Sequence, residues 1–239
     1  MTEPLIQLVG VHKSYRRGTE TIHVLNGINL DMSAGAFYAL MGPSGSGKTT
    51  LLNLIGGLDS ADAGSLFVAG EDLSGLTGSE LARWRADNVG FVFQGFNLLS
   101  VLTALENVEL PLHLAPLSKK QRRKQAERVL DLVGLADRMH HKPKELSGGE
   151  EQRVAIARAI ATDPKVVLAD EPTGDLDRAS AEQVLGLMER LNKELNKTIL
   201  MVTHDPVAAG HASHVVHLDK GTLGAIETNP DRLAAAAGS

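Results

Sequence analysis

Short apolar stretches rich in β-branched residues alternate along the chain with stretches of helical periodicity. This alternation is typical of a β-sheet with helices packed on its faces. Two stretches, 39–41 and 166–168, contain no polar residue, so both faces of these strands are expected to be covered. The pattern predicts an α/β fold with a buried, mainly parallel central sheet and strands at residues 6–11, 37–41, 89–93, 166–169, 198–202 and 215–218.

The pattern changes to helices between Gln94 and Pro164. It predicts helices at residues 104–114, 118–133 and 150–161, and these indicate a helical insertion between two strands of the main sheet. Residues 229–239 carry a short alanine run, for which we expect a frayed or marginal helix.

A glycine-rich segment after the second predicted strand has the spacing of a phosphate-binding loop, and a helix is predicted over 49–55 directly after it. Glycines let successive backbone N–H groups converge on phosphates, and the helix adds its positive N-terminal end. Lys48 is expected to pair with phosphate and Thr49 to bind Mg²⁺. The predicted nucleotide-binding residues of this segment are Gly42, Pro43, Ser44, Gly45, Ser46, Gly47, Lys48, Thr49 and Thr50.

The apolar strand at 166–169 ends in two acids, Asp170 and Glu171. Its carboxyl end is expected to meet the phosphate loop on a neighbouring strand. Asp170 would hold Mg²⁺, which prefers oxygen ligands, and Glu171 would accept a proton from the attacking water. Two acids at a strand end can also cap the next element, but the phosphate loop favours the catalytic interpretation.

Composition narrows the class of protein further. The 239 residues include no cysteine, which excludes disulfides and thiolate metal sites and suits a reducing cytosol. The formal net charge of -5 gives no support to nucleic acid as the main ligand. No stretch approaches the roughly 20 apolar residues of a membrane span, so we expect any membrane link to come through a partner protein.

Residues 146–153, Leu-Ser-Gly-Gly-Glu-Glu-Gln-Arg, resemble the signature of the ABC ATPase family, and the resemblance runs from Leu5 to about Leu223. It implies a phosphate-loop (RecA-like) core, an antiparallel β subdomain and an inserted helical subdomain. It also implies a homodimer in which Ser147, Gly148 and Gly149 of one copy cover the ATP bound to the phosphate loop of the other. The free N–H groups at the start of a helix would suit that contact.

Glu150 stands where many family members carry glutamine. Ser147 and Glu150 have the spacing of a capping box, so Glu150 is expected to return a hydrogen bond to the Ser147 backbone. A direct contact between Glu150 and nucleotide stays open as the alternative.

Four further positions match the family and take their roles from the resemblance. Gln94 would be the glutamine that touches Mg²⁺ or the lytic water, and His204 the histidine that contacts the γ-phosphate. Tyr15 would stack on adenine, and Asp177 would belong to the loop that follows the acidic pair.

Other patterns favour simpler interpretations. His214 and His217 are three apart in a predicted strand and so face opposite sides, which argues against a metal site. The basic run at 119–124 is expected to be the solvated face of an amphipathic helix, with an acidic lipid surface or nucleic acid as the alternative. Phe96 and residues 98–101 either pack in the helical core or lie near the permease interface that the family implies.

The phrase from Phe91 to Leu112 resembles the MacB/LolD group, which energises macrolide or peptide efflux and lipoprotein release. The resemblance implies an ATPase peripheral to the cytoplasmic side of the inner membrane, bound to a separately encoded permease. An FtsE-like cell-division ATPase is the alternative; a soluble ABC protein acting on ribosomes or DNA, or a scaffold without hydrolysis, fits less well. We expect one domain over 1–239, with the ATP-binding core at 1–94 and 160–225, the helical subdomain at 95–159 and a tail at 226–239.

Overall fold

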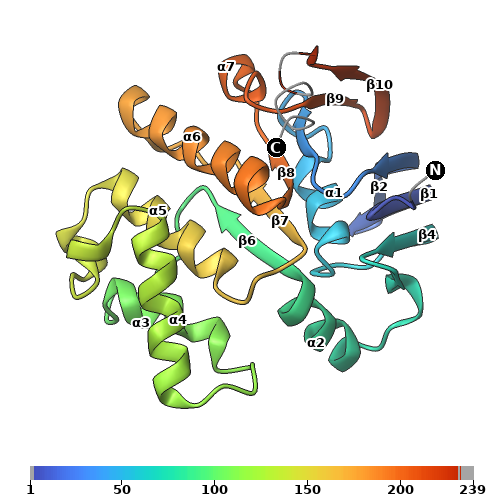
Figure 1. Ribbon diagram of the computed structural model, residues 1–239. Helices are drawn as coiled ribbons and strands as arrows, with labels where there is room; N and C mark the ends of the chain where they lie inside the picture. Colours follow the sequence, from blue (N-terminus) through green and yellow to red (C-terminus); the bar gives the residue numbers. More distant parts are fainter. Residues whose placement is uncertain (1–2, 231, 233–239) are drawn as a thin grey trace.

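Two β-sheets form the frame of the computed structural model, which describes residues 3–230 and 232 (Figure 1). Most of the expected C-terminal helix at 229–239 lies outside the described residues. The larger sheet has the strand order β10-β9-β3-β8-β7-β6. Its strands are β3 (Phe37–Met41), β6 (Val89–Phe93), β7 (Val166–Asp170), β8 (Thr198–Val202), β9 (His214–Asp219) and β10 (Thr222–Thr228).

The sheet is parallel from β9 to β6, and β10 pairs antiparallel with β9. The predicted bounds of β3, β6 and β8 are confirmed residue for residue. β10 was not predicted, because nearly all of its side chains are exposed and it shows no apolar alternation. It carries the sheet to Thr228, so residues 226–228, which were expected to belong to the tail, lie in a strand instead.

Alternate residues of the central strands enter two separate hydrophobic cores, which confirms that both faces of the sheet are covered. Phe37 and Ala39 pack into one core with the helices that lie between residues 104 and 195. Tyr38 and Leu40 pack into the other, with the helix Lys48–Ile55 and the smaller sheet. The site at the carboxyl ends of these strands therefore stands on a sheet held from both sides.

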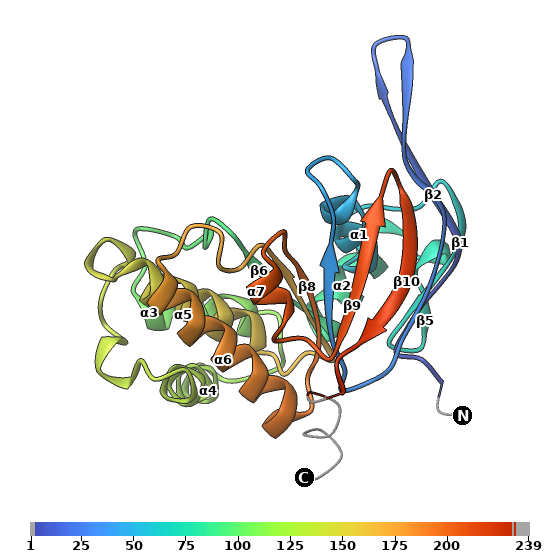
Figure 2. The ribbon, with the colours of Figure 1, turned by 90° about the horizontal axis from the view of Figure 1, so that it is seen from above.

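The smaller sheet is antiparallel, with the order β2-β1-β4-β5. Its strands are β1 (Ile6–Arg17), β2 (Glu20–Met32), β4 (Ala63–Val68) and β5 (Glu71–Asp72). The antiparallel subdomain implied by the family resemblance is thus present, although only part of β1 was predicted from the pattern. The hairpin of β1 and β2 extends well beyond the rest of the molecule (Figure 2), and its exposed outer half lacks the alternation that identifies a strand.

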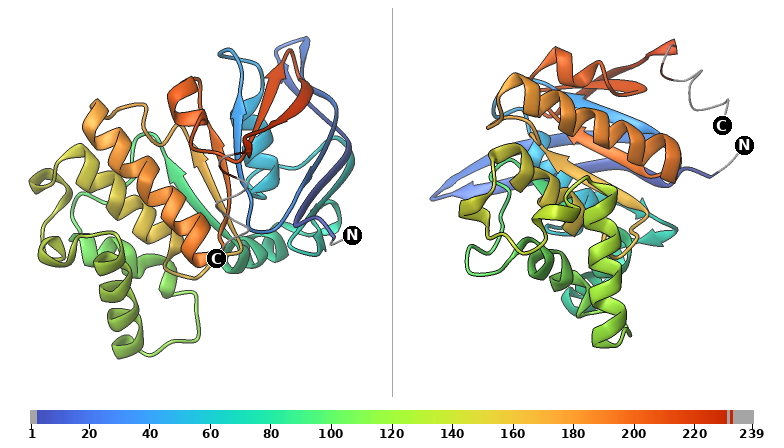
Figure 3. Two further views of the ribbon diagram at one scale, coloured as in Figure 1. Left: turned by 45° about the horizontal axis from the view of Figure 1, so that its top comes forward. Right: turned by 60° about the vertical axis from the view of Figure 1, so that its left-hand side comes forward.

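Three helices lie between β6 and β7 in the chain and confirm the helical insertion. They gather at the end of the molecule away from the β1–β2 hairpin (Figure 3). These three are α3 (Ala104–Leu112), α4 (Lys119–Leu132) and α5 (Gly148–Ile160). The other helices of the described residues are α1 (Lys48–Ile55), α2 (Gly78–Asn88), α6 (Arg178–Leu195) and α7 (Pro206–Ala209), and 3-10 turns lie at Leu73–Gly75, Ala136–Arg138 and Pro143–Glu145.

The inserted helices differ from the predictions in small ways. α3 ends at Leu112, two residues before the predicted end. α4 buries Ala126, Val129 and Leu130, while Lys119 and Lys120 of the basic run are exposed. The amphipathic interpretation of this run is therefore confirmed.

Candidate functional site

The phosphate loop connects β3 to α1 and requires glycine at two of its positions. Gly47 caps α1 with φ 104°, and a Cβ there would come 3.0 Å from the Val24 carbonyl oxygen. A Cβ on Gly42 would collide with the Leu218 carbonyl oxygen of β9. These glycines are needed because the loop is left-handed at these positions and packs directly against neighbouring backbone.

The start of α1 is suited to bind an anion. Gly47 offers no capping side chain, and the first turn of α1 has no acid. Lys48 is only 7% exposed, and its Nζ donates to the carbonyl oxygens of Gly42 and Pro43 at 2.8 and 2.9 Å. The buried Oγ of Ser46 has no hydrogen-bond partner among the described residues. Uncapped N–H groups, a buried ammonium and an unpaired hydroxyl together fit a phosphate chain.

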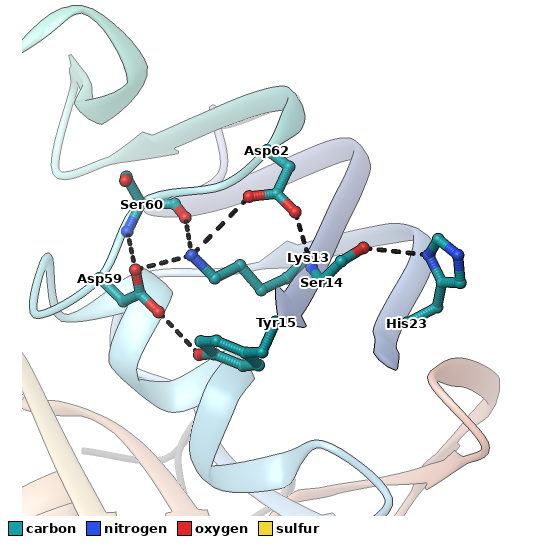
Figure 4. Close-up of polar contacts among 7 residues, drawn as sticks. All are labelled: Lys13, Ser14, Tyr15, His23, Asp59, Ser60 and Asp62. Atoms are coloured by element: carbon teal, nitrogen blue, oxygen red, sulfur yellow. Dashed lines mark hydrogen bonds and ion pairs between the residues drawn. The ribbon is translucent and has the colours of Figure 1, made fainter. Parts of the chain in front are cut away.

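A single pocket joins the phosphate loop to Tyr15 and Glu171. The Tyr15 side chain lies 41% exposed on β1, and its hydroxyl donates to Asp59 Oδ2 at 2.7 Å (Figure 4). Burial, followed by the bond to Asp59, raises the pKa of Tyr15, so the phenol is neutral. The pocket is lined by Tyr15, Val24, Ser44, Gly45, Gly47, Lys48, Thr49, Thr50 and Glu171.

The acidic pair lies at the carboxyl end of β7, but one detail of the prediction is wrong. β7 and β3 are not neighbours, because β8 lies between them. The phosphate loop still reaches Asp170, since α1 extends across the sheet and Thr49 Oγ1 donates to Asp170 Oδ1 at 3.4 Å. Burial raises the pKa of the Asp170 carboxyl, and the charge of Glu171 raises it further, while the bond from Thr49 opposes both.

Glu171 leaves the strand in a left-handed conformation with φ 47°. Its N–H donates to the Val202 carbonyl oxygen at 3.0 Å, which ties it to the end of β8. Its Oε2 lies 3.1 Å from Nδ1 of His204. A second, smaller pocket is lined by Glu171, Thr173, Gly174, Thr203, His204 and Asp205. Glu171 therefore connects the phosphate-loop pocket to the histidine.

Gln94 follows β6, whose last residue Phe93 pairs with Asp170 of β7. Its Nε2 donates to Asp175 Oδ1 at 2.8 Å, and a Cβ on Gly174 would lie 3.0 Å from that nitrogen. The glutamine thus touches the loop that follows the acidic pair, and its carbonyl oxygen faces no donor among the described contacts. Asp177 of the same loop caps α6 by accepting from the N–H groups of Ala179 and Ser180, each at 3.0 Å.

The signature segment opens α5, and the capping box expected from its spacing is confirmed. The Glu150 N–H donates to Ser147 Oγ at 3.3 Å, and the Ser147 N–H donates to Glu150 Oε2 at 2.8 Å. That backbone bond, and then Arg138 at 3.1 Å, hold the pKa of Glu150 below its usual value. Ser147, Gly148 and Gly149 do not line the phosphate-loop pocket of their own chain.

Several histidines take structural positions. The His214 ring stacks on Tyr38 at 4.4 Å, and burial lowers its pKa. His217 is half-exposed near Glu227, and His211 pairs with Glu189 of α6. His214 and His217 therefore have different neighbours, as their spacing predicts.

Two residues beside Tyr15 were missed at the sequence level. Lys13 is 7% exposed, and its Nζ lies 2.7 Å from Asp59 Oδ1. Lys13 is two positions before Tyr15 on one strand, which is a weak signal that both share a face. Asp59 lies 44 residues from Tyr15 in the sequence, so no local pattern indicates their contact.

Comparisons with known proteins identify the family of this chain. Residues 25–174 match the ABC transporter family. The chain is 49% identical over 221 residues to the macrolide export ATP-binding/permease protein MacB of Rhodopirellula baltica, covering 92% of this chain and 32% of that protein, so it spans about a third of that relative. It is 46% identical to the lipoprotein-releasing system ATP-binding protein LolD of Saccharophagus degradans, covering 93% and 98% of the two chains.

Among solved structures, the chain is similar to the ATP-binding cassette MJ0796 of Methanocaldococcus jannaschii, described as dimeric, in a post-hydrolysis state and bound to ADP and Pi. The TM-score is 0.86 at 43% identity, covering 93% of this chain and 98% of that one. The chain belongs to the ABC transporter family. Within that family it is an ATP-binding subunit, an ABC-type ATPase homologous to the MacB and LolD cassettes. In the described part of the chain, no helix has the length and apolar character needed to cross a bilayer.

Proposed function

We propose that this ATPase acts as a homodimer on a separately encoded membrane permease of the MacB or LolD type, bound peripherally at the cytoplasmic side of the inner membrane. ATP would close the dimer and hydrolysis would release it, so that each cycle pulls on the permease. The cargo is macrolide, peptide, lipoprotein or lipid in this group.

The dimer explains why one chain holds an incomplete site. The phosphate-loop pocket is lined by Lys48 and Glu171 but by no signature residue. Ser147 Oγ accepts one bond inside its own chain and keeps its proton to donate elsewhere. A second copy placed head to tail would bring that hydroxyl and the start of α5 onto the γ-phosphate, which is favourable for an anion. The dimeric cassette MJ0796 supports this arrangement.

Mg²⁺ fits the oxygen groups beside the phosphate loop. Thr49 and Asp170 already touch through their side-chain oxygens, and Gln94 follows the strand paired with β7. Hard oxygen ligands are what Mg²⁺ prefers. When bound, the ion would neutralise phosphate charge. Tyr15 lines the same pocket and would stack on the adenine ring.

The position of Glu171 carries the catalytic proposal. It lines both the phosphate-loop pocket and the smaller pocket that contains His204. A carboxylate there can take a proton from water attacking the γ-phosphate, while His204 and the Val202 carbonyl hold its orientation. Lys48 would balance the charge on the phosphate.

Replacement of the base tests this assignment. Glu171→Gln keeps the size of the side chain and should lower ATP turnover at least tenfold, since general base catalysis contributes about 10²–10⁴-fold. ATP binding should persist, and the variant should accumulate as an ATP-bound dimer in light scattering. Glu194→Gln is the control, because it removes the same charge from an exposed position of α6. Wild-type turnover in Glu171→Gln would show that another group activates the water.

A groove beside the helical insertion is suited to the permease. It is lined by residues of α2, the end of α3, α4 and the end of α5, and Pro111 and Leu114 line both of its halves. Leu114 is 77% exposed, and Val101 of the neighbouring loop is 74% exposed. Apolar side chains gathered around one groove, unlike exposed residues scattered singly, suit a protein contact surface. Asn97, which lies in the chain between Phe96 and residues 98–101, lines this groove.

An FtsE-like ATPase would use the same ATP-binding residues, so the membrane partner distinguishes the two functions. Copurification with a MacB- or LolD-type permease, and stimulation of ATPase activity by that permease in lipid, supports the transport assignment. Copurification with a partner of the cell-division type would instead support the FtsE-like function.

A further inference from the structure

Tyr15 lies in an unusual place for a residue that must present a flat ring to a ligand. It is on the β1–β2 hairpin, whose outer half projects from the body of the molecule (Figure 2). Its side chain is 41% exposed, so packing alone does not fix the ring. A ring on such a strand samples several staggered rotamers unless something holds it.

A group of polar side chains next to the phosphate-loop helix holds the ring. Asp59 Oδ2 accepts from the Tyr15 hydroxyl, and Asp59 Oδ1 accepts from Lys13 Nζ, each at 2.7 Å (Figure 4). The Ser60 N–H also donates to Asp59 Oδ1 at 2.7 Å. Both oxygens of the carboxylate are therefore occupied, and the position of the phenol follows that of the carboxylate.

Lys13 in turn fixes the carboxylate. It is only 7% exposed, and its Nζ donates to the Ser60 carbonyl oxygen at 2.7 Å and lies 3.8 Å from Asp62 Oδ1. The same Nζ lies 5.1 Å from the centre of the Tyr15 ring, on its face. A buried ammonium is costly unless it is paired, so Lys13 and Asp59 require each other.

The position of Asp59 in the chain links this cluster to the phosphate loop. α1 begins at the phosphate loop and ends at Ile55, and Asp59 lies in the turn directly after it. One end of this segment thus supplies the phosphate site and the other supplies the anchor of the aromatic ring. The register of β1 against β2 shifts between Lys13 and Ser14, and such irregularities re-aim side chains.

We infer that Asp59, held by Lys13, is a positioning residue that sets the Tyr15 ring at a fixed distance from the phosphate loop and so selects nucleotides that carry a stacking base. This inference rests on the proposed contact between Tyr15 and adenine. The bonds from Lys13 and Tyr15 outweigh burial and keep the pKa of Asp59 below its usual value, so the acceptor is ionised at neutral pH. The cluster acts on the base, whereas Lys48 acts on the phosphates.

The test separates base recognition from phosphate binding in the intact chain. KM and kcat for ATP are measured together with inhibition by inorganic tripolyphosphate, which has no base. Asp59→Ala should raise KM for ATP about tenfold and leave kcat and tripolyphosphate inhibition within about twofold, because it weakens the stacking of the base on one aromatic ring and leaves the phosphate contacts in place. Tyr15→Phe keeps the ring but loses its anchor and should raise KM about threefold. Tyr15→Phe still tests the role of the Asp59 bond if Asp59→Ala folds poorly.

Two controls show whether Asp59 changes KM through the Tyr15 ring. Asp62→Ala removes an acid from the same turn that touches Lys13 but not Tyr15, and it should leave KM within about twofold. In a Tyr15→Ala background, Asp59→Ala should add nothing to the rise in KM, since the ring it positions is gone.

The outcomes are distinguishable. If Tyr15→Ala raises KM for ATP but Asp59→Ala and Tyr15→Phe do not, the positioning role is overturned and the stacking proposal stands. If Tyr15→Ala leaves KM unchanged, the stacking proposal fails and this inference fails with it. If Asp59→Ala weakens tripolyphosphate as much as ATP, the residue supports the whole site and does not act on the base.

Discussion

Asn107 of α3 offers a sharp test of how the loop before the helical insertion is held. Its side chain is fully buried, and its Oδ1 accepts from the Leu99 N–H at 2.8 Å. Its Nδ2 donates to the carbonyl oxygens of Leu99, Leu102 and Thr103 at 3.2, 3.3 and 3.0 Å. One amide group therefore satisfies both ends of the loop that carries the exposed Val101.

The expected loss follows from counting these bonds. An amide has two N–H groups for three carbonyl oxygens, so the side chain makes about three effective bonds. At about 1 kcal/mol each, with an added cost for the Leu99 N–H left buried, Asn107→Ala should lower the free energy of unfolding by about 3–4 kcal/mol. That is a large part of the roughly 5–15 kcal/mol that stabilises an ordinary domain.

Asn107→Asp separates this account from simple loss of packing. The carboxylate keeps the acceptor for Leu99 but places negative charge against three carbonyl oxygens. The variant should be less stable than Asn107→Ala at pH 8, and it should recover as the pH falls and the carboxyl becomes protonated. Urea unfolding followed by the fluorescence of Trp84 measures both effects. Asn26→Ala, at an exposed position, should change stability by less than about 0.5 kcal/mol. An Asn107→Asp variant as stable as the wild type at pH 8 would refute the reasoning.

Two further predictions concern the phosphate loop and the sheet. Lys48→Ala should weaken ATP binding at least tenfold in a direct titration, because the ammonium buried at the loop is the cation nearest the start of α1; unchanged affinity would remove Lys48 from the phosphate contact. The pKa of His214 is lowered by burial, so the unfolded chain binds more protons than the folded one below about pH 6.5, and stability should fall from pH 7 to pH 5. His214→Phe keeps the stacking on Tyr38 and should flatten that slope in urea unfolding measured at each pH; an unchanged slope would assign the loss to other groups.

The parts of the fold that could be predicted from sequence are those whose burial is regular. β3, β7 and β8 are apolar on both faces, so their sequences predict strands that are buried on both sides. α2 buries none of its residues, and the outer half of β2 is exposed, so neither produces a period that can be recognised. Their positions depend on tertiary contacts, which override local preference.

The site divides in the same way. The loop from Gly42 to Thr49 and the acids at the carboxyl end of β7 are local motifs, and their chemistry can be inferred from spacing. The order of strands is not local, and the insertion of β8 between β3 and β7 could not be inferred from either motif. Likewise, the contact of Tyr15 with Asp59 joins two segments whose separation in sequence hides it.

The contacts around α5 explain how the signature segment and the groove proposed for the permease can act on each other. Arg158 of α5 donates to the carbonyl oxygens of Phe96, at 2.8 Å, and Asn97. Both residues have positive φ, a conformation that costs free energy for side chains other than glycine and so depends on such bonds. Gln152 of α5 donates to the carbonyl oxygens of Phe93 and Pro172 at 3.3 and 2.6 Å.

Helix α5 therefore begins at the signature segment and, further along, binds both the end of β6 before Gln94 and the turn at Phe96 and Asn97 beside the groove. If a second copy pulls on the start of α5, as in the proposed dimer, these bonds must either move the turn at Phe96 and Asn97 with the helix or break. Breaking them would leave two carbonyl oxygens and a largely buried guanidinium unpaired, which is the costlier outcome. Rigid movement of α5 together with this turn is thus the path of lower free energy from the nucleotide to the groove.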